Sequence, residues 1–368
     1  MFETPRGNRL HIALFGRRNA GKSSLINALT NQSLAIVSAV AGTTTDPVYK
    51  SMEILPIGPV VVIDTAGLDD VGELGELRIA KSLEVLRKTD LVLLVVDAAV
   101  GIGDPEKTLA LKCAEQKIPF ILAFNKSDLR EVAEDLLESA RRALGAVAAV
   151  AVSAQERRGI GELKIAMVRH APAHWDTQTI VGDLLQPGDI AVLVVPIDLA
   201  APAGRLILPQ VQMIRDILDH DALAYTVKER ELKECIASLN RKPRIVITDS
   251  QVFLKADADT PPDVLLTSFS ILFARYKGDL ETMVRGAKAI DRLKPGDKVL
   301  ISESCTHHRV EDDIGTVKIP RWLRQHVGGE LVVDHSSGLT FPQNLSEYKL
   351  VLHCGACMTN RREMLARI

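Results

Sequence analysis

Residues 16–23 constrain the fold of this chain more than any other segment. They have the sequence GRRNAGKS and stand between the apolar run HIALF and the helical pattern SLINAL. This is the G-x-x-x-x-G-K-S pattern of a phosphate-binding loop, in which glycines let backbone N–H groups close around phosphate oxygens. A helix that starts in the loop points the positive end of its dipole at the same phosphates. We therefore expect a strand, this loop and a helix at the start of an α/β domain.

Two further segments supply contacts to the metal and the phosphates. The apolar run PVVVID ends at Asp64, which is placed to hold Mg²⁺ through water, and the N–H of Gly67 can meet a γ-phosphate. In AGTTTDPV we expect Thr44 to join Ser23 as a ligand of Mg²⁺. Lys22 is expected to reach the β- and γ-phosphates and to take part in catalysis. The loop residues expected to bind the nucleotide are Gly16, Asn19, Ala20, Gly21, Lys22, Ser23 and Ser24.

Residues after two later strands predict the base of the nucleotide. The run IPFILAF leads into Asn125-Lys126-Ser-Asp128. Asp128 can accept hydrogen bonds from both N1–H and the exocyclic amine of guanine, whereas adenine would leave the carboxylate unpaired. VAAVAV ends at Ser153-Ala154, where a backbone N–H can reach the guanine O6. With five guanine-nucleotide motifs in the right order, the segment resembles a small GTPase domain.

The residues for hydrolysis differ from those of Ras-like enzymes. Leu68 stands where such an enzyme has a water-orienting Gln. Asn19 matches the position at which potassium-dependent GTPases of the tRNA-modifying family coordinate K⁺, which neutralises developing charge. That resemblance implies a GTP hydrolase stimulated by K⁺. Glu76 or Glu73 is a candidate for orienting water, and the alternative is that both are solvated residues before the next helix.

Composition excludes several classes of protein. Five cysteines in 368 residues are too few for a secreted disulfide scaffold. The formal net charge of −2 gives no global attraction to nucleic acid or anionic membrane. No apolar run approaches the roughly 18 residues of a membrane span, and the first residues lack the core of a signal peptide. We therefore expect a cytoplasmic protein with no membrane or nucleic-acid partner.

Three cysteines in the last third predict a second chemistry. The run KVLISES leads to Cys305, and YKLVLH leads to Cys354-Gly-Ala-Cys357. Because the carboxyl ends of parallel strands meet at one edge of a sheet, the three thiols can converge. They could hold an iron–sulfur cluster or Zn²⁺, form a redox dithiol, or belong to an ordinary core.

The order of these motifs resembles one particular family. A GTPase domain is followed by C-T-H at 305–307 and by H-C-G-A-C at 353–357, as in the FeFe-hydrogenase maturation GTPases. The resemblance implies an α/β fold with a P-loop GTPase domain followed by two smaller α/β domains, the last carrying an iron–sulfur cluster. The expected bounds are 1–173 for the GTP-binding domain, 174–265 for a dimerisation domain and 266–368 for the cluster domain.

The same resemblance implies how the last domain works. Cys305, Cys354 and Cys357 would bind three irons of a 4Fe-4S cluster, and the fourth iron would keep an exchangeable ligand. Candidates for that ligand are His307, His353 and Asp312, although the histidines could equally form hydrogen bonds to cluster sulfur. The protein would be a homodimeric GTPase scaffold or carrier. It would receive a diiron precursor from radical-SAM maturases and deliver it to the apo-FeFe-hydrogenase.

Two alternatives belong to other classes. One is a GTPase of RNA modification or ribosome assembly whose third domain holds structural zinc, against which the near-neutral charge and an aromatic content of only 4% argue. The other is a redox sensor in which Cys354 and Cys357 form a disulfide. Measurements of RNA binding and of free thiols separate these alternatives from the metallocluster scaffold.

Overall fold

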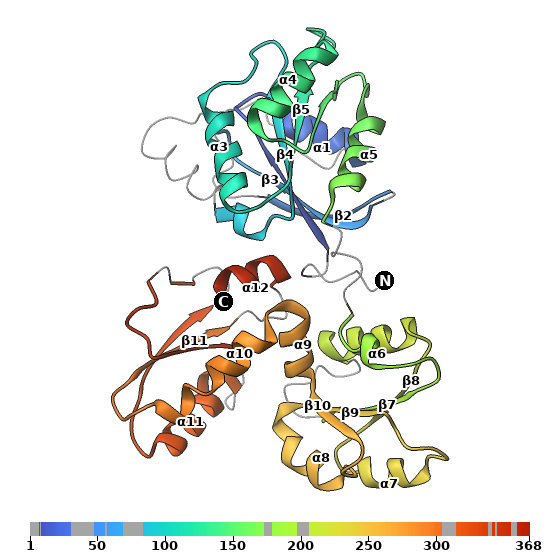
Figure 1. The fold of residues 1–368 in the computed structure, drawn as a ribbon, viewed down its shortest axis with the longest axis vertical. Helices are drawn as coiled ribbons and strands as arrows, with labels where there is room; N and C mark the ends of the chain where they lie inside the picture. Colours follow the sequence, from blue (N-terminus) through green and yellow to red (C-terminus); the bar gives the residue numbers. More distant parts are fainter. Residues whose placement is uncertain are drawn as a thin grey trace. The chain divides into compact units, whose positions relative to one another are not determined.

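The chain forms two compact units, Met1–Thr177 and Gln178–Ile368. The computed structural model describes residues 7, 9–30, 48–55, 57–68, 84–172, 179–196, 206–303, 314–337, 341–342, 344–354 and 359–368. Figure 1 traces these elements along the chain. Each unit is described by itself.

The first unit contains a six-stranded sheet in the order β2-β3-β1-β4-β5-β6. β2 pairs with β3 in antiparallel fashion, and the other neighbours pair in parallel. The described elements are β1 (Leu10–Phe15), α1 (Lys22–Thr30), β2 (Val48–Ile54), β3 (Gly58–Asp64), η2 (Leu86–Lys88), β4 (Leu91–Asp97), α3 (Asp104–Glu115), β5 (Phe120–Asn125), α4 (Glu134–Leu144), β6 (Ala148–Ala151) and α5 (Ile160–His170).

Helices cover both faces of this sheet, which explains why its central strands are continuous apolar runs. Side chains of α1 and α5 pack with one face of β1, β3 and β4, and side chains of α3 and α4 pack with the other face. Figure 1 shows α3 on one side of the sheet and α1 and α5 on the other. The strand, loop and helix expected around residues 16–23 are therefore present as β1 and α1.

The second unit begins with a four-stranded parallel sheet in the order β10-β9-β7-β8. β8 is half-exposed at an edge of the sheet, and it lies between two helices in the sequence. The described elements are η3 (Gly182–Leu184), β7 (Ile190–Val194), α6 (Leu208–Asp219), β8 (Leu223–Val227), α7 (Leu232–Ser238), β9 (Ile245–Thr248), η4 (Ser250–Val252), α8 (Phe253–Asp259) and β10 (Leu265–Ser268).

The helix that follows β10 belongs to the core of this sheet. In α9 (Phe269–Lys277), the side chains of Phe269, Leu272 and Phe273 pack with α6 and the sheet. α9 covers a face of the sheet that would otherwise be exposed. The expected domain boundary after residue 265 lies inside β10, so it separates α9 from the sheet on which this helix packs.

A three-stranded parallel sheet follows, in the order β12-β11-β13. α11 packs on one face through Leu323, against Val299 and Ile301 of the central strand. The described elements are α10 (Leu280–Ala287), η5 (Ile290–Arg292), β11 (Lys298–Glu303), the π-helical turn η6 (Ile314–Lys318), α11 (Ile319–Val327), β12 (Val332–Ser337), β13 (Leu350–Cys354) and α12 (Arg361–Arg367).

The last helix is tied to the end of α9. Arg361, the first residue of α12, donates from Nη1 to the carbonyl oxygens of Tyr276 and Gly278 at 2.7 and 3.1 Å. Asn360 caps the helix by accepting from the N–H of Glu363. Among the described helices, none is long and apolar enough to cross a membrane.

Protonation of a buried histidine is expected to limit the acid stability of the first unit. Burial lowers the pKa of His11, on β1, to about 4, although a hydrogen bond from Nδ1 to the Arg9 carbonyl favours the protonated ring. The unfolded chain takes up this proton below about pH 6.5. The stability that the folded state gains from keeping His11 neutral is therefore complete at pH 7 and is lost as the pH falls toward 4.

We expect the free energy of unfolding of the first unit to fall by about 2 kcal/mol between pH 7 and pH 5 through His11 alone. Pulse proteolysis in urea on the full chain measures this quantity. His11→Asn keeps a donor at the position of Nδ1 but does not titrate, so it should lose about that much of the pH dependence. An unchanged pH dependence in the variant contradicts the assignment.

Candidate nucleotide-binding site and cysteine region

The phosphate-binding loop folds around the ammonium group of its lysine. Lys22, at the start of α1, is buried, and its Nζ donates to the carbonyl oxygens of Gly16 and Arg17, both at 2.9 Å. The loop is therefore closed on a positive charge next to the N-terminus of a helix. A phosphate placed at this point would meet the ammonium group and the helix dipole together.

A close neighbour and the backbone conformation together require glycine at position 21 of this loop. Gly21 has φ +90°, and a Cβ there would overlap the side-chain amide of Asn125. Asn125 in turn donates from Nδ2 to the carbonyl of Ala20 at 2.9 Å. The conformation of the loop is thus fixed from the end of β5, 105 residues along the chain.

The expected magnesium ligands meet at the ends of α1 and β3. The hydroxyl of Ser23 donates to Oδ2 of Asp64 at 2.8 Å. The hydroxyl of Thr65 donates to the carbonyl of Leu14 at 2.6 Å, which holds the segment after β3 against β1. Hydroxyl and carboxylate oxygens are the ligands that Mg²⁺ prefers, so this pair fits the metal. Thr44, the other expected ligand, lies outside the described residues.

The start of the segment after Asp64 is fixed to the phosphate loop. The N–H of Leu68 donates to the carbonyl of Gly16 at 3.2 Å, so Gly67 directly precedes a residue bound to the loop. The Leu68 side chain packs into the apolar core beside α3, as expected for an aliphatic residue in place of a water-orienting glutamine. The candidates for orienting water, Glu73 and Glu76, lie outside the described part of the chain.

Asn125 joins the phosphate end of the site to the base end. Its side chain is 2% exposed. Besides its bond to Ala20, it accepts at Oδ1 from the N–H of Ala154 at 3.0 Å. One amide therefore links three of the five motifs, and both its donor and its acceptor are satisfied, as buried polar groups require.

The loop after Asn125 presents the groups expected to bind guanine. Lys126 has φ +63° and donates from Nζ to Oδ2 of Asp97 at 2.6 Å. Partial burial would raise the pKa of Asp97, but hydrogen bonds from Lys126 and two backbone N–H groups hold that pKa below its usual value. Asp128 is half-buried and forms no hydrogen bond with another described residue. Its carboxylate is available to a base with two adjacent donors.

The last motif is held by a short antiparallel bridge. Ser153 is buried and exchanges two backbone hydrogen bonds with Arg158, at 2.9 and 3.2 Å. Arg158 also donates from Nη2 to the carbonyl of Ser127 at 2.8 Å. The two loops that would enclose the base are therefore fixed to each other.

Sequence reasoning did not find three charged residues that support this site. They are Asp97, which binds Lys126, and the ion pair of Arg17 with Glu106. Asp97 ends an apolar strand, as Asp64 does. This shared pattern is a signal that could have indicated Asp97 as a site residue. The ion pair joins residues 89 positions apart and follows no motif.

The cysteine region lies at the carboxyl edge of the three-stranded sheet. In the register of this sheet Glu303, the last residue of β11, pairs with Cys354, the last residue of β13. The two neighbouring parallel strands thus end side by side, and Cys305 follows the end of β11 by two residues. Cys305, Cys357, His307 and Asp312 lie outside the described residues. Within the described part, no group of three His, Cys, Asp or Glu side chains could hold a metal ion.

This arrangement fits an iron–sulfur cluster or another thiolate-bound metal at that edge. Parallel strands bring their carboxyl ends together, and the backbone places Cys354 beside the strand that leads to Cys305. Three cysteines supply the soft thiolate ligands that such a centre takes. The residue types and the pairing of these two strands are therefore compatible with the expected 4Fe-4S cluster.

One candidate for the fourth ligand has another partner. Nε2 of His353 lies 2.8 Å from Nη1 of Arg367, which can only donate. Arg367 is also bound to Glu363 on the same helix at 2.6 Å. In this arrangement the Nε2 lone pair of His353 points to α12, so that atom is not free to bind iron.

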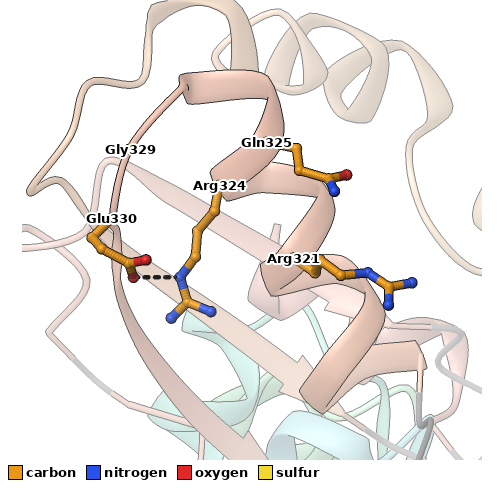
Figure 2. A pocket seen from close by; sticks show the side chains of 5 residues that line it. All are labelled: Arg321, Arg324, Gln325, Gly329 and Glu330. Carbon is orange, nitrogen blue, oxygen red and sulfur yellow. Dashed lines mark ion pairs between the residues drawn. The ribbon is translucent and has the colours of Figure 1, made fainter.

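A separate pocket of about 300 Å³ opens on the surface near the end of α11 (Figure 2). Arg321, Arg324 and Gln325 line it from the helix, with Gly329 and Glu330 from the turn that follows. Arg324 forms an ion pair with Glu330 at 2.9 Å. The pocket contains none of the residues expected to bind nucleotide or metal.

The base end of the site gives a sharp test of specificity. Asp128→Asn should raise the Kd for GDP about a hundredfold, because it replaces an ionised acceptor of two hydrogen bonds. Affinity for the xanthosine nucleotide, which has a carbonyl in place of the exocyclic amine, should rise relative to GDP. Titration with fluorescent nucleotides measures both constants. The matched control Asp135→Asn, on the exposed surface of α4, should change neither, and equal GDP affinity in both variants would remove Asp128 from the site.

Curated relatives match the first unit. The tRNA modification GTPase MnmE of Dechloromonas aromatica is 34% identical over 166 residues, which is 45% of this chain and 36% of that protein. MnmE of Moorella thermoacetica is 41% identical over 160 residues, which is 42% of this chain and 33% of that protein. The chain thus spans about a third of the length of these relatives.

Solved GTPase structures are similar at lower identity. Era in complex with MgGDPNP and 16S ribosomal RNA nucleotides is 18% identical, with a TM-score of 0.41, and the match covers 59% of this chain and 93% of that one. Era of Aquifex aeolicus, bound to GDP and AlF4⁻, is 19% identical, with a TM-score of 0.41 and coverage of 62% and 98%.

Family models cover both units. The model described as a 50S ribosome-binding GTPase matches residues 11–126. The hydrogen maturase F dimerization domain matches residues 180–278, which include the four-stranded sheet and α9, and the hydrogen maturase F tetramerization domain matches residues 281–368, which include the three-stranded sheet. Because both of these domains follow a GTPase domain in one chain, the chain belongs to the hydrogen maturase F family.

Proposed function

We propose that this protein is a GTPase scaffold or carrier that assembles or transfers the diiron precursor during FeFe-hydrogenase maturation. One observation carries the proposal. A GTPase domain precedes the two hydrogen maturase F domains, and the last of these contains the Cys-x-His and His-Cys-x-x-Cys motifs. Radical-SAM maturases would supply the precursor, and the apo-hydrogenase would receive it.

The first unit would bind and hydrolyse GTP. Lys22 and the N-terminus of α1 meet the phosphates, Ser23 and Asp64 hold Mg²⁺, and Asp128 selects guanine. Leu68 cannot orient water, so stabilisation of charge must come from elsewhere. Asn19 supplies a candidate. It has φ +60°, a left-handed conformation that exposes its side chain at the turn of the loop. An amide oxygen there would bind K⁺ next to the phosphates.

The second unit would hold the cargo. Cys305, Cys354 and Cys357 would bind a 4Fe-4S cluster, which supplies an iron with a replaceable ligand to the incoming diiron precursor. A carrier must release what it binds, so an exchangeable site serves better than a fourth thiolate. His307 and Asp312 remain candidates for the replaceable ligand. His353 is a weaker candidate, because Arg367 donates to its Nε2.

Hydrolysis would control the exchange of partners rather than the metal chemistry. A switch needs a segment that contacts GTP and GDP differently. The segment after Asp64 fits this need, because its Leu68 N–H is bound to Gly16 of the phosphate loop. The dimerization and tetramerization domains would hold several copies together, with a homodimer as the basic unit.

A second candidate is a GTPase of RNA modification with a structural zinc site. The identity of 34–41% to tRNA modification GTPases favours it. That similarity is confined to less than half of this chain, and the residues that follow match other domains. A gel-shift assay at increasing salt separates the two candidates, because RNA binding weakens steeply with salt.

The proposal predicts that nucleotide controls binding to the hydrogenase. Affinity of the full chain for the apo-hydrogenase should differ about tenfold or more between a GTP analogue and GDP, since coupling of this kind amounts to 5–150-fold. Isothermal titration measures both constants, and Asp128→Asn should abolish the difference at the same nucleotide concentration. Equal affinities in the two states contradict a switch, and RNA binding with no hydrogenase binding favours the second candidate.

Potassium should accelerate hydrolysis through Asn19. We expect kcat for GTP to be at least about tenfold higher in KCl than in NaCl at equal ionic strength, because a cation beside the phosphates neutralises charge in the transition state. Asn19→Ala should lower the rate in KCl to the rate in NaCl. Equal rates of the unchanged protein in the two salts would refute the potassium site.

A further inference from the structure

The connection between β4 and α3 touches both ends of the nucleotide site, although it contains none of the five motifs. At one end Asp97 binds Lys126 of the guanine motif at 2.6 Å. At the other end Glu106, in the first turn of α3, binds Nη2 of Arg17 in the phosphate loop at 2.8 Å. Residues 97–106 therefore span the site from the base loop to the phosphate loop.

The contact to the phosphate loop is an ion pair whose carboxylate is buried. The Glu106 side chain is 1% exposed, and the Arg17 side chain is 27% exposed. The same carboxylate oxygen of Glu106 also accepts from the N–H of Gly103 at 2.8 Å. A buried carboxylate is costly unless a charge and hydrogen bonds compensate it. Arg17 supplies the charge, so the loop and α3 are held together strongly.

The glycine at position 103 makes room for this pair. A Cβ on Gly103 would overlap the guanidinium group of Arg17. The backbone of Gly103 is extended, with φ −131°, so conformation alone does not require glycine there. A Cβ at this position would instead displace the guanidinium group from its present place.

Arg17 also belongs to the part of the loop that holds the catalytic lysine. Its carbonyl and that of Gly16 both accept from Lys22 Nζ at 2.9 Å. The Gly16 carbonyl accepts from Leu68 as well. Fixing the Arg17 side chain on α3 therefore fixes the two carbonyls that orient Lys22 and one end of the segment after Asp64.

We propose that the Arg17–Glu106 ion pair is a positioning device for the phosphate-binding loop. Arg17 acts through its backbone and not through contact with the phosphates, because its guanidinium group is bound to Glu106. The pair keeps the loop in its binding conformation before nucleotide arrives. A preformed loop loses less conformational entropy on binding, so affinity for nucleotide is higher.

Glu106→Gln tests this with the smallest change of shape. The glutamine can still accept from the Gly103 N–H but no longer compensates Arg17. We expect the Kd for GDP and the KM for GTP to rise together about tenfold, with kcat within about twofold, because the loop binds ground state and transition state alike. Gly103→Ala should give the same pattern, since it displaces the guanidinium group and leaves both charges in place.

A control separates positioning from general stability. Glu138→Gln removes an ion pair with Arg141 and Arg142 on the surface of α4, in the same unit. It should leave Kd, KM and kcat unchanged. The double variant Arg17→Met/Glu106→Gln removes both charges of the pair and should recover thermal stability relative to Glu106→Gln. Its Kd for GDP should stay raised, and by no more than that of the worse single variant.

Three results would overturn the proposal. One is unchanged GDP affinity in Glu106→Gln at a temperature where the variant is folded. Another is a loss of affinity in Arg17→Met with none in Glu106→Gln, which would mean that Arg17 contacts the phosphates directly. The third is full recovery of GDP affinity in the double variant together with its thermal stability, which would mean that the pair only stabilises the fold.

Discussion

Parallel pairing of strands is the constraint on which both candidate sites depend. In the first unit it places the ends of β1, β3 and β5 at one edge of the sheet, so that Lys22, Asp64 and Asn125 meet although 103 positions separate the first from the last. In the second unit the same rule brings the end of β13, at Cys354, beside the end of β11. One sheet edge gathers groups suited to a nucleotide, and at the other the strand that precedes Cys305 lies beside the strand that ends at Cys354.

Buried polar groups then fix the loops that the sheet brings together. The amide of Asn125 holds the phosphate loop and the last guanine motif at once. Asp97 and Glu106 add charged contacts at the two ends of the site. Such groups are costly to bury without partners, so each loop is stable mainly when the others are in place. Nucleotide bound at any of these points is therefore expected to stabilise the contacts at the others.

Motifs with a strict spacing could be predicted from the sequence, and contacts between distant residues could not. The strands that lead to Gly16, Asp64 and Asn125 are apolar runs that pass directly into motif residues, so their type and position were evident. β8 and β10 have only five and four residues. β8 is half-exposed at a sheet edge, which left little apolar pattern to detect. The Arg17–Glu106 pair depends on the path of the chain between β4 and α3. The roles of Thr44, Glu76, Cys305 and Cys357 stay predictions, because these residues lie outside the described part of the chain.

The most direct test of the scaffold account is the metal content of the second unit in the full chain. Iron, sulfide and zinc should be measured after anaerobic reconstitution, together with the EPR spectrum of the dithionite-reduced protein. The account predicts about four irons and four sulfides per chain and an S = 1/2 signal that is lost in Cys354→Ala but kept in Cys235→Ala. One zinc per chain, with no iron and no EPR signal, would contradict it. Only the part of the account that concerns nucleotide binding and hydrolysis would then remain.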